Sequence, residues 1–267
     1  MSSHLSPWMA RSAELSWLLL CALLPIDGRL IPVPLALTVV LILLPSVFKK
    51  QRVEWAILWP LFAFYALHLL GLLWSTDLPF GLFDVQIKLG LVLLPLAAGA
   101  IAQRWPGALR QSMVAFTLGS TVAFALSIFK GWMCYTASSD PGCFSQSAFS
   151  YSLHPSYAAW YACWLVAYWV VELLRGRVKS GPFRIGVGLA IVVAVAFIAL
   201  LASKSGAIGL LLVGMFLGVM VLRRLSGRKR NILLFAGLVG LVAALSGRTS
   251  QVGARMAVAW QAVEHAM

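Results

Sequence analysis

The chain has 267 residues, of which 61% are hydrophobic and only 11% are charged, and its mean hydropathy is +0.90. A soluble domain of this length cannot bury so much apolar surface, so the composition indicates a polytopic membrane protein. The formal net charge is +13. The basic residues form short clusters between apolar segments rather than one basic face, which argues against nucleic acid as a partner.

Apolar segments of the length that a membrane-spanning helix needs, about 20 residues, follow one another along the chain. None of them shows the alternating polarity of barrel strands. We therefore predict an all-α fold, a polytopic transmembrane helical bundle of about nine spans. The predicted spans are 12–25, 31–48, 55–73, 88–102, 111–129, 156–174, 185–202, 206–222 and 231–246.

Lysine and arginine are distributed unequally between alternate loops. If the N-terminus lies inside, 15 of the 21 fall on the inner side, and the outer side holds six: Arg29, Lys88, Lys130, Lys204, Arg248 and Arg255. Because basic residues collect in cytoplasmic loops, we predict a multi-pass protein of the bacterial cell inner membrane with a cytoplasmic N-terminus and a periplasmic C-terminus. The basic clusters then face anionic headgroups, so membrane lipids are expected partners.

The predicted domain organisation has one main body. Residues 1–246 form the transmembrane bundle, with short cytoplasmic loops and a larger outer loop at 130–155. Residues 247–267 begin a periplasmic segment, in which the spacing of Arg255, Trp260 and Val263 is compatible with an amphipathic surface helix. The first span lacks the cleavage-site pattern of a signal peptide, so it is expected to be retained.

Two cysteines of the outer loop, Cys134 and Cys143, flank a Ser-Ser-Asp-Pro-Gly segment whose composition is typical of a turn. On the outer face of an inner membrane such a pair can oxidise to a disulfide, but two cysteines alone leave the reduced form equally open. A metal pair is disfavoured because no further ligand follows at a familiar spacing. Cys21 and Cys163 lie inside predicted spans and are interpreted as small packing residues.

The two most informative outer segments are HPSY at 154–157 and LASKSGA at 201–207. Pro155 is suited to the first turn of a helix, so His154 is expected at the N-terminus of a span, where it is either an anion ligand or a polar cap in an aromatic belt. Lys204 lies in a very short turn between two spans. It either snorkels to water or serves a function at the membrane edge.

The outward-facing cations form one set: Lys88, Lys130, His154, Lys204, Arg248 and Arg255. Arginine and lysine form charge-assisted hydrogen bonds with phosphate oxygens, so the set is suited to an anionic lipid headgroup. The sequence contains no Walker loop, zinc signature or Ser-His-Asp order that suggests another chemistry. No metal and no cofactor are expected.

The chain resembles the O-antigen ligase and polymerase superfamily, whose members transfer lipid-linked glycans. The resemblance covers roughly 55–267 and rests on four segments in order: LLWSTD at 72–77, HPSY at 154–157, LASKSGA at 201–207, and the Arg248, Arg255 and Trp260 pattern. It implies a GT-C-like fold that transfers a glycan from undecaprenyl diphosphate to a hydroxyl of lipid A-core, a glycan or a protein at the periplasmic face. It also implies a role in surface polysaccharide or lipopolysaccharide biosynthesis.

The resemblance further implies which residues bind the diphosphate. Lys204 and Arg255 are the first candidates, followed by Arg248, and Lys88, His154 and Asp77 are weaker ones. Lys204 stands where the family has arginine, so the charge is kept but the bidentate fork is lost. The family's large periplasmic domain, with its catalytic histidine and further spans, is absent. The resemblance therefore predicts a C-terminally truncated member that is inactive alone and whose catalytic residues are unknown.

Two other classes of function remain open from the sequence. A transporter or flippase for a lipid-linked or anionic solute would carry polar groups near the middle of several spans, and His68 is the main candidate for such a group. A non-catalytic truncated remnant would insert into the membrane in the same way as an active enzyme.

Overall fold

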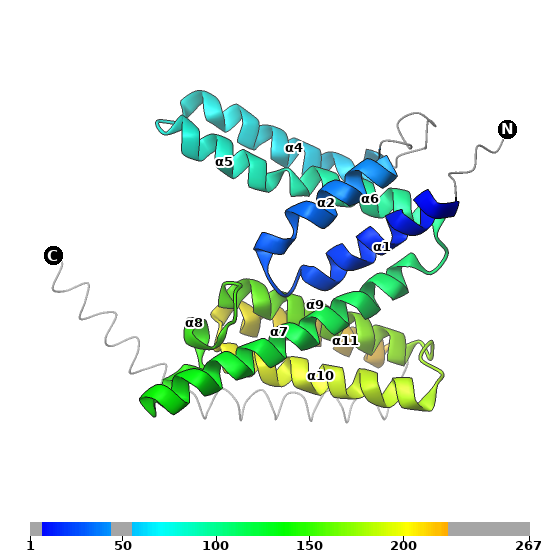
Figure 1. Ribbon diagram of the computed structural model, residues 1–267. Helices are drawn as coiled ribbons and strands as arrows, with labels where there is room; N and C mark the ends of the chain where they lie inside the picture. Colours follow the sequence, from blue (N-terminus) through cyan, green and yellow to red (C-terminus); the bar gives the residue numbers. More distant parts are fainter. Residues whose placement is uncertain (1–6, 44–54, 224–267) are drawn as a thin grey trace. The chain divides into compact units, whose positions relative to one another are not determined.

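The computed structural model describes residues 7–43 and 55–223, which form helices and contain no strand (Figure 1). The chain divides into two units, 1–213 and 214–267, and the packing given below is that of the first. The elements in chain order are α1 (Pro7–Leu23), η1 (Gly28–Leu30), α2 (Pro32–Thr38), η2 (Val39–Leu43), α4 (Trp55–Gly71), η3 (Leu72–Trp74), α5 (Leu78–Lys88), α6 (Gly90–Arg104), α7 (Ala108–Ser138), η4 (Pro141–Phe144), α8 (Gln146–Phe149), α9 (Pro155–Leu174), α10 (Gly181–Leu201) and α11 (Lys204–Leu222).

Five helical stretches of the described residues are long and apolar enough to cross a membrane. They are Leu78–Arg104, Ala108–Ser138, Pro155–Leu174, Gly181–Leu201 and Lys204–Leu222. Two shorter apolar stretches, Gly28–Ile42 and Leu58–Trp74, accompany them. The all-helical fold of a membrane bundle is therefore confirmed in its coarse form. The ninth predicted span, 231–246, lies outside the described residues.

Two long helical stretches lie outside the predicted spans. Helix α7 does not end near residue 129 but continues to Ser138, so the expected loop at 130–155 begins with more than two further helical turns. The predicted span 88–102 corresponds to α6 (Gly90–Arg104), and a separate helix, α5, precedes it directly from Leu78, where the Asp77 carboxylate accepts a hydrogen bond from Phe80 N at 3.0 Å and caps α5. Both stretches consist of mixed polar and apolar residues, which a hydropathy pattern assigns to loops.

Helices α7 and α9 run antiparallel, and a polar contact near each end fixes their pairing. Trp169 Nε1 donates to Thr117 Oγ1 at 2.7 Å. Toward the opposite end of α7, Ser127 Oγ accepts from Tyr151 N, just before α9, at 3.1 Å. The two contacts lie in reversed sequence order, which defines the antiparallel direction.

The neighbouring helices continue this alternation. Helix α10 runs parallel to α7, because the ring of Phe197 stacks on Phe124 with centroids 4.0 Å apart, while Phe183 lies under the Arg110 guanidinium at 5.4 Å. Helix α11 runs parallel to α9, because Gly206 packs on Ala159 and Gly209 packs on the next turn of α9. Consecutive long helices from α7 to α11 thus point in opposite directions, as membrane crossings joined by short loops must.

Helix α1 packs against α7 in a parallel arrangement. Trp17 Nε1 donates to Ser112 Oγ at 2.7 Å, and five residues further along α1 the backbone carbonyl of Ala22 lies against Gly119. A Cβ atom at position 119 would overlap that carbonyl, so this close approach requires glycine.

Charged residues lie mainly at the two ends of the group formed by α1, α7, α9, α10 and α11. The first end, named here the basic end, is formed by the starts of α1, α7 and α10 and by the end of α9 with its following loop. Its cations are Arg11, Arg110, Arg175, Arg177, Lys179 and Arg184. Two acids, Glu14 and Glu172, lie at the same end. The opposite end carries Asp27 and Asp140 together with the basic residues Arg29, Lys130, His154 and Lys204. The described residues thus place more cations at the basic end than at the opposite end.

Candidate functional site

The connection between α10 and α11 is only two residues long. Helix α10 ends at Leu201, Ala202 adopts a left-handed conformation with φ of 46°, and α11 begins at Lys204. The Ser203 hydroxyl accepts a hydrogen bond from Gly206 N at 3.3 Å and so caps the new helix. This turn places Lys204 in the first turn of α11, where the side chain is exposed.

Helix α9 begins at the same end of the bundle, at the HPSY segment. Pro155 occupies the first helical turn, and His154 is the N-cap, with its Nδ1 accepting from Ser156 N at 3.3 Å. The prediction that His154 precedes the helix is confirmed. The second ring nitrogen of the exposed His154 points away from this cap bond and is free to donate to a ligand.

The two segments that the sequence singled out come together in space. Ser203 Oγ donates to Ser156 Oγ at 3.4 Å, and Ser203 Oγ and Ser205 Oγ lie 2.9 Å apart. One turn into the helices, a Cβ built on Gly206 would lie 2.5 Å from the Ala159 Cβ. The starts of α9 and α11 are therefore held side by side by close packing and by a cluster of hydroxyls.

This arrangement concentrates positive potential. Two helix N-termini point the same way, and each presents the positive end of a helix dipole. At the start of α9, Pro155 has no N–H group, Ser156 N donates to His154 Nδ1 and Tyr157 N donates to the His154 carbonyl, so the dipole rather than free N–H groups supplies the positive potential there. Lys204 adds a full charge beside Ser203 and Ser205, and His154 adds a donor beside Ser156. Neither Lys204 nor His154 forms an ion pair within the described residues. The geometry is suited to an anion with several oxygen atoms, such as a phosphate ester.

Two weaker candidates have other partners. Lys88 at the end of α5 is ion-paired with Asp84, one helical turn before it. The i, i+4 spacing of the two residues was the signal in the sequence that could have revealed this pair. Asp77 caps α5, and Ser75 Oγ donates to its carbonyl at 2.9 Å. The LLWSTD segment is thus a helix-capping turn in this structure.

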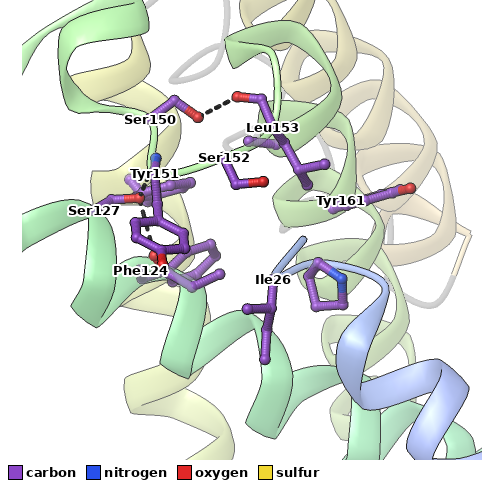
Figure 2. A pocket seen from close by; sticks show the side chains of 12 residues that line it. Ile26, Phe124, Ser127, Ser150, Tyr151, Ser152, Leu153 and Tyr161 are labelled. Atoms are coloured by element: carbon purple, nitrogen blue, oxygen red, sulfur yellow. Dashed lines mark hydrogen bonds between the residues drawn. The ribbon is translucent and has the colours of Figure 1, made fainter. Parts of the chain in front are cut away.

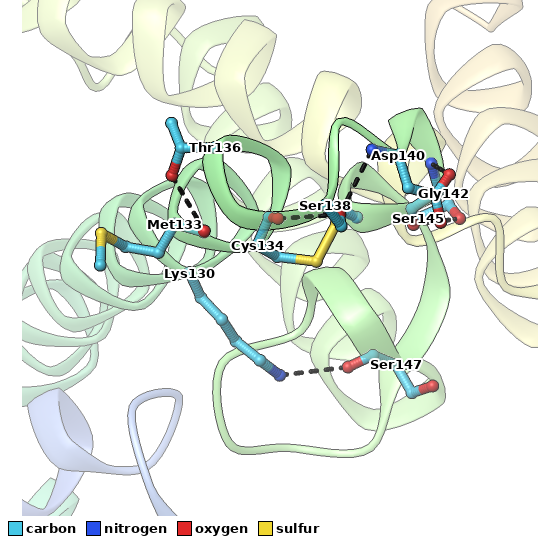
Figure 3. Close-up of a disulfide and its surroundings, with 10 residues drawn as sticks. Lys130, Met133, Cys134, Thr136, Ser138, Asp140, Gly142, Ser145 and Ser147 are labelled. Carbon is cyan, nitrogen blue, oxygen red and sulfur yellow. Dashed lines mark hydrogen bonds between the residues drawn. A yellow bond between two sulfur atoms is a disulfide. The ribbon is translucent and has the colours of Figure 1, made fainter.

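Lys130 is also engaged, in the segment that the disulfide closes (Figure 3). Its ammonium donates to the carbonyl of Ser150 at 2.6 Å and to that of Ser147 at 3.2 Å. A few residues along α7, Cys134 and Cys143 are joined by a disulfide with Cα atoms 5.7 Å apart. Lys130 and the disulfide together fasten residues 139–153 onto the end of α7.

A small cavity lies under the same segment (Figure 2). The empty space between its lining residues, including the part open to the surroundings, is about 290 Å³, and its polar groups include Ser127, Ser150, Ser152 and Tyr161. The walls are otherwise apolar, with Phe124 and Phe197 among them. A cavity of this shape leaves room for about one ordered water rather than for a glycan.

The predicted ligands Arg248 and Arg255 lie outside the described residues. The structure thus brings together the segments of His154 and Lys204, places Lys88 and Lys130 in other contacts, and does not describe the two arginines. Within the described residues, no group of three or more His, Cys, Asp or Glu side chains could hold a metal ion.

The sequence reasoning missed the serines. Ser156 follows His154 by two residues, and Ser203 and Ser205 flank Lys204. The hydroxyls of Ser156 and Ser203 form the contact between the starts of α9 and α11. Their signal was the Ser-Lys-Ser order around the turn together with a serine in the first turn after His154. Serine at such positions is common as a helix cap, so the pattern alone did not identify a joint site.

The comparisons with known proteins do not extend this description. No protein-family model, no curated protein and no solved structure matches the chain. What the chain does is therefore inferred from the geometry of this site and from the sequence motifs that form it.

Proposed function

We propose that the chain binds a polyprenyl diphosphate at the joined starts of α9 and α11, as an undecaprenyl-diphosphate-dependent glycan transferase of the O-antigen ligase and polymerase type. The observation that carries the proposal is the contact between Ser203 and Ser156. This contact joins the HPSY segment at 154–157 to the LASKSGA segment at 201–207, two of the motifs on which the resemblance rests. Lys204 therefore lies beside the N-terminus of a second helix, α9.

The chemistry expected at this site is an inverting displacement. An acceptor hydroxyl of lipid A-core, a glycan or a protein attacks the anomeric carbon of the donor sugar, and the bond to the diphosphate oxygen breaks. Negative charge then develops on the departing undecaprenyl diphosphate. Lys204, the serine hydroxyls and the positive ends of the two helix dipoles are groups of the kind that stabilise such charge. Arg248 and Arg255 are proposed to complete the donor set from the periplasmic side.

The proposed setting follows from the charge distribution. The basic end of the bundle faces the cytoplasm and the site faces the periplasm, in a bacterial inner membrane, with about nine spans and a GT-C-like arrangement. In this orientation the diphosphate of a membrane-embedded polyprenyl lipid lies at the depth of the headgroups. Lys204, at the edge of the apolar part of α11, lies at the same depth.

A binding measurement tests the proposal. The full chain in nanodiscs should bind undecaprenyl diphosphate, and Lys204→Ala should weaken binding by roughly tenfold or more, the effect of losing one hydrogen bond to a charged group. Lys204→Arg should keep or improve binding, because guanidinium binds phosphate with a bidentate fork. Lys179→Ala, which removes an exposed cation at the basic end, is the matched control. Wild-type affinity in Lys204→Ala would place the site elsewhere.

A further inference from the structure

A second feature lies at the basic end, where a groove opens between α1, α7 and α10. The space along it, including the part open to the surroundings, is about 860 Å³, and its apolar walls are formed by Leu18, Val114, Ala115, Leu118 and Phe183. Sites for small molecules usually enclose roughly 300–1,000 Å³. The groove is therefore large enough for an extended acyl chain, unlike the small cavity at the opposite end.

The polar groups of the groove gather at one point. Arg110 and Gln111 are its only polar lining residues, and they are adjacent in the first turn of α7. The Arg110 guanidinium lies 5.4 Å from the centre of the Phe183 ring, and such a cation–π contact orients it while its N–H groups stay available. The other walls offer no hydrogen-bonding side chain.

Arg110 has no carboxylate partner within the described residues. The buried acid nearby on α9, Glu172, is ion-paired with Arg177 at 3.1 Å. Glu14 on α1, one helical turn from Leu18, forms no ion pair with Arg110. The positive charge at the mouth of the groove is thus not neutralised by the protein.

We infer that this groove binds an anionic phospholipid, with the phosphate of its headgroup at Arg110 and Gln111 and one acyl chain along the apolar walls. A basic pocket between helices at a membrane surface is suited to such a headgroup. The site is separate from the proposed diphosphate site, because it lies at the other end of α7 and α10 and is formed by different residues.

The two parts of the groove contribute differently. An acyl chain gains little hydrophobic free energy when it leaves the bilayer for the groove, because lipid tails are as apolar as the walls. Selectivity must therefore come from the headgroup and from Arg110, while the walls determine whether a chain fits. A lipid with a net negative headgroup should bind better than a zwitterionic one with the same chains.

Native mass spectrometry of the full chain in detergent tests this inference, with dioleoyl phosphatidylglycerol and dioleoyl phosphatidylcholine as probes. The wild type should retain phosphatidylglycerol preferentially. Arg110→Gln should lose about fivefold in affinity for it, the ratio expected for one basic residue near an anionic surface, and Arg110→Lys should keep most of the preference. Ala115→Phe should fill the groove and reduce retention of both lipids.

Three controls separate lipid binding in the groove from diffuse attraction and from loss of the fold. Arg175→Gln removes an exposed cation at the same end but outside the groove, so it should bind as the wild type does. An equal loss in Arg175→Gln, or none in Arg110→Gln, would show only diffuse attraction and overturn the site. Displacement of the lipid by glycerol 3-phosphate would indicate a site for free anions instead. Thermal melting of each variant confirms that it is folded.

Discussion

The hydroxyl of Ser203 donates a hydrogen bond to the hydroxyl of Ser156 at 3.4 Å, across 47 residues of sequence. The bond itself is long and weak. Its position matters more, because it reports that the starts of two parallel helices, α9 and α11, lie at the same level. When two helices start at the same level, the partial positive charges of their N-termini lie close together, so their electrostatic potentials add at one place.

The close packing of α9 and α11 should depend on Gly206. A Cβ at this position would lie 2.5 Å from the Ala159 Cβ, so Gly206→Ala should destabilise the chain by about 1–3 kcal/mol, as overpacking of a well-packed core does. Gly218→Ala is the control, since nothing lies within 4 Å of its Cβ position. That change should be neutral or stabilising by up to about 1 kcal/mol. Thermal unfolding in detergent measures both, and equal effects would contradict the close approach.

The disulfide should be detectable by thiol labelling. The chain has four cysteines, of which Cys21 and Cys163 are free. Mass-tagging of the denatured chain should add two tags without reductant and four with it. The double variant Cys134→Ser, Cys143→Ser should give the same labelling in both states. Reduction should lower stability by about 2–4 kcal/mol in the wild type alone. Identical labelling of the wild type with and without reductant would leave the segment unbridged.

Lys130 should hold residues 146–150 in place. Lys130→Met removes both hydrogen bonds to the carbonyls of Ser147 and Ser150. The amides of Phe149 and Ser150, which donate within this segment, should then exchange faster with deuterium, by roughly tenfold if about 1.4 kcal/mol of local stability is lost. Lys179→Met at the basic end should leave their exchange unchanged. Unchanged exchange in Lys130→Met would assign the fastening to the disulfide alone.

The orientation of the helices predicts the activity of reporter fusions. Alkaline phosphatase is active only outside the cytoplasm, so a fusion in the 139–154 segment or after Met267 should be active. A fusion in the basic loop at 176–180 or within 223–230 should be inactive. The physical reason is the collection of basic residues on the cytoplasmic side. The reverse pattern would invert the bundle and place the Lys204 site in the cytoplasm.

The sequence predicted those parts of the fold that depend on local chemistry. The proline after His154 predicted the start of α9. The short segment 201–207 predicted a turn between α10 and α11, although Lys204 lies in the first turn of α11 rather than between the helices. The prediction for the end of α7 was wrong. The apolar run ends at Lys130, whereas the helix continues to Ser138 because its backbone hydrogen bonds continue beyond the apolar run.

The candidate site was predicted only in part, for a similar reason. The cations were visible in the sequence, but their partners were not. Lys130 binds two backbone carbonyls, and such a long-range contact carries no sequence signature. The meeting of Ser156 with Ser203 likewise depends on how α9 packs against α11, which residue type and spacing leave open.

The parallel packing of α1 on α7 has a consequence for the order of assembly. Trp17 and Ser112, which form one of its hydrogen bonds, are separated by 95 residues. At a synthesis rate of about 5–20 residues per second, α1 emerges from the ribosome about 5–20 s before its partner. During that interval the Ala22 carbonyl faces no Gly119 and Trp17 Nε1 has no Ser112, whereas Ser16 of α1 can already pair with Thr38 of α2, at 2.8 Å and only 22 residues further along the chain. The first helix can therefore pair with α2 soon after both are made, but its contact with α7 forms only after the middle of the chain has been made.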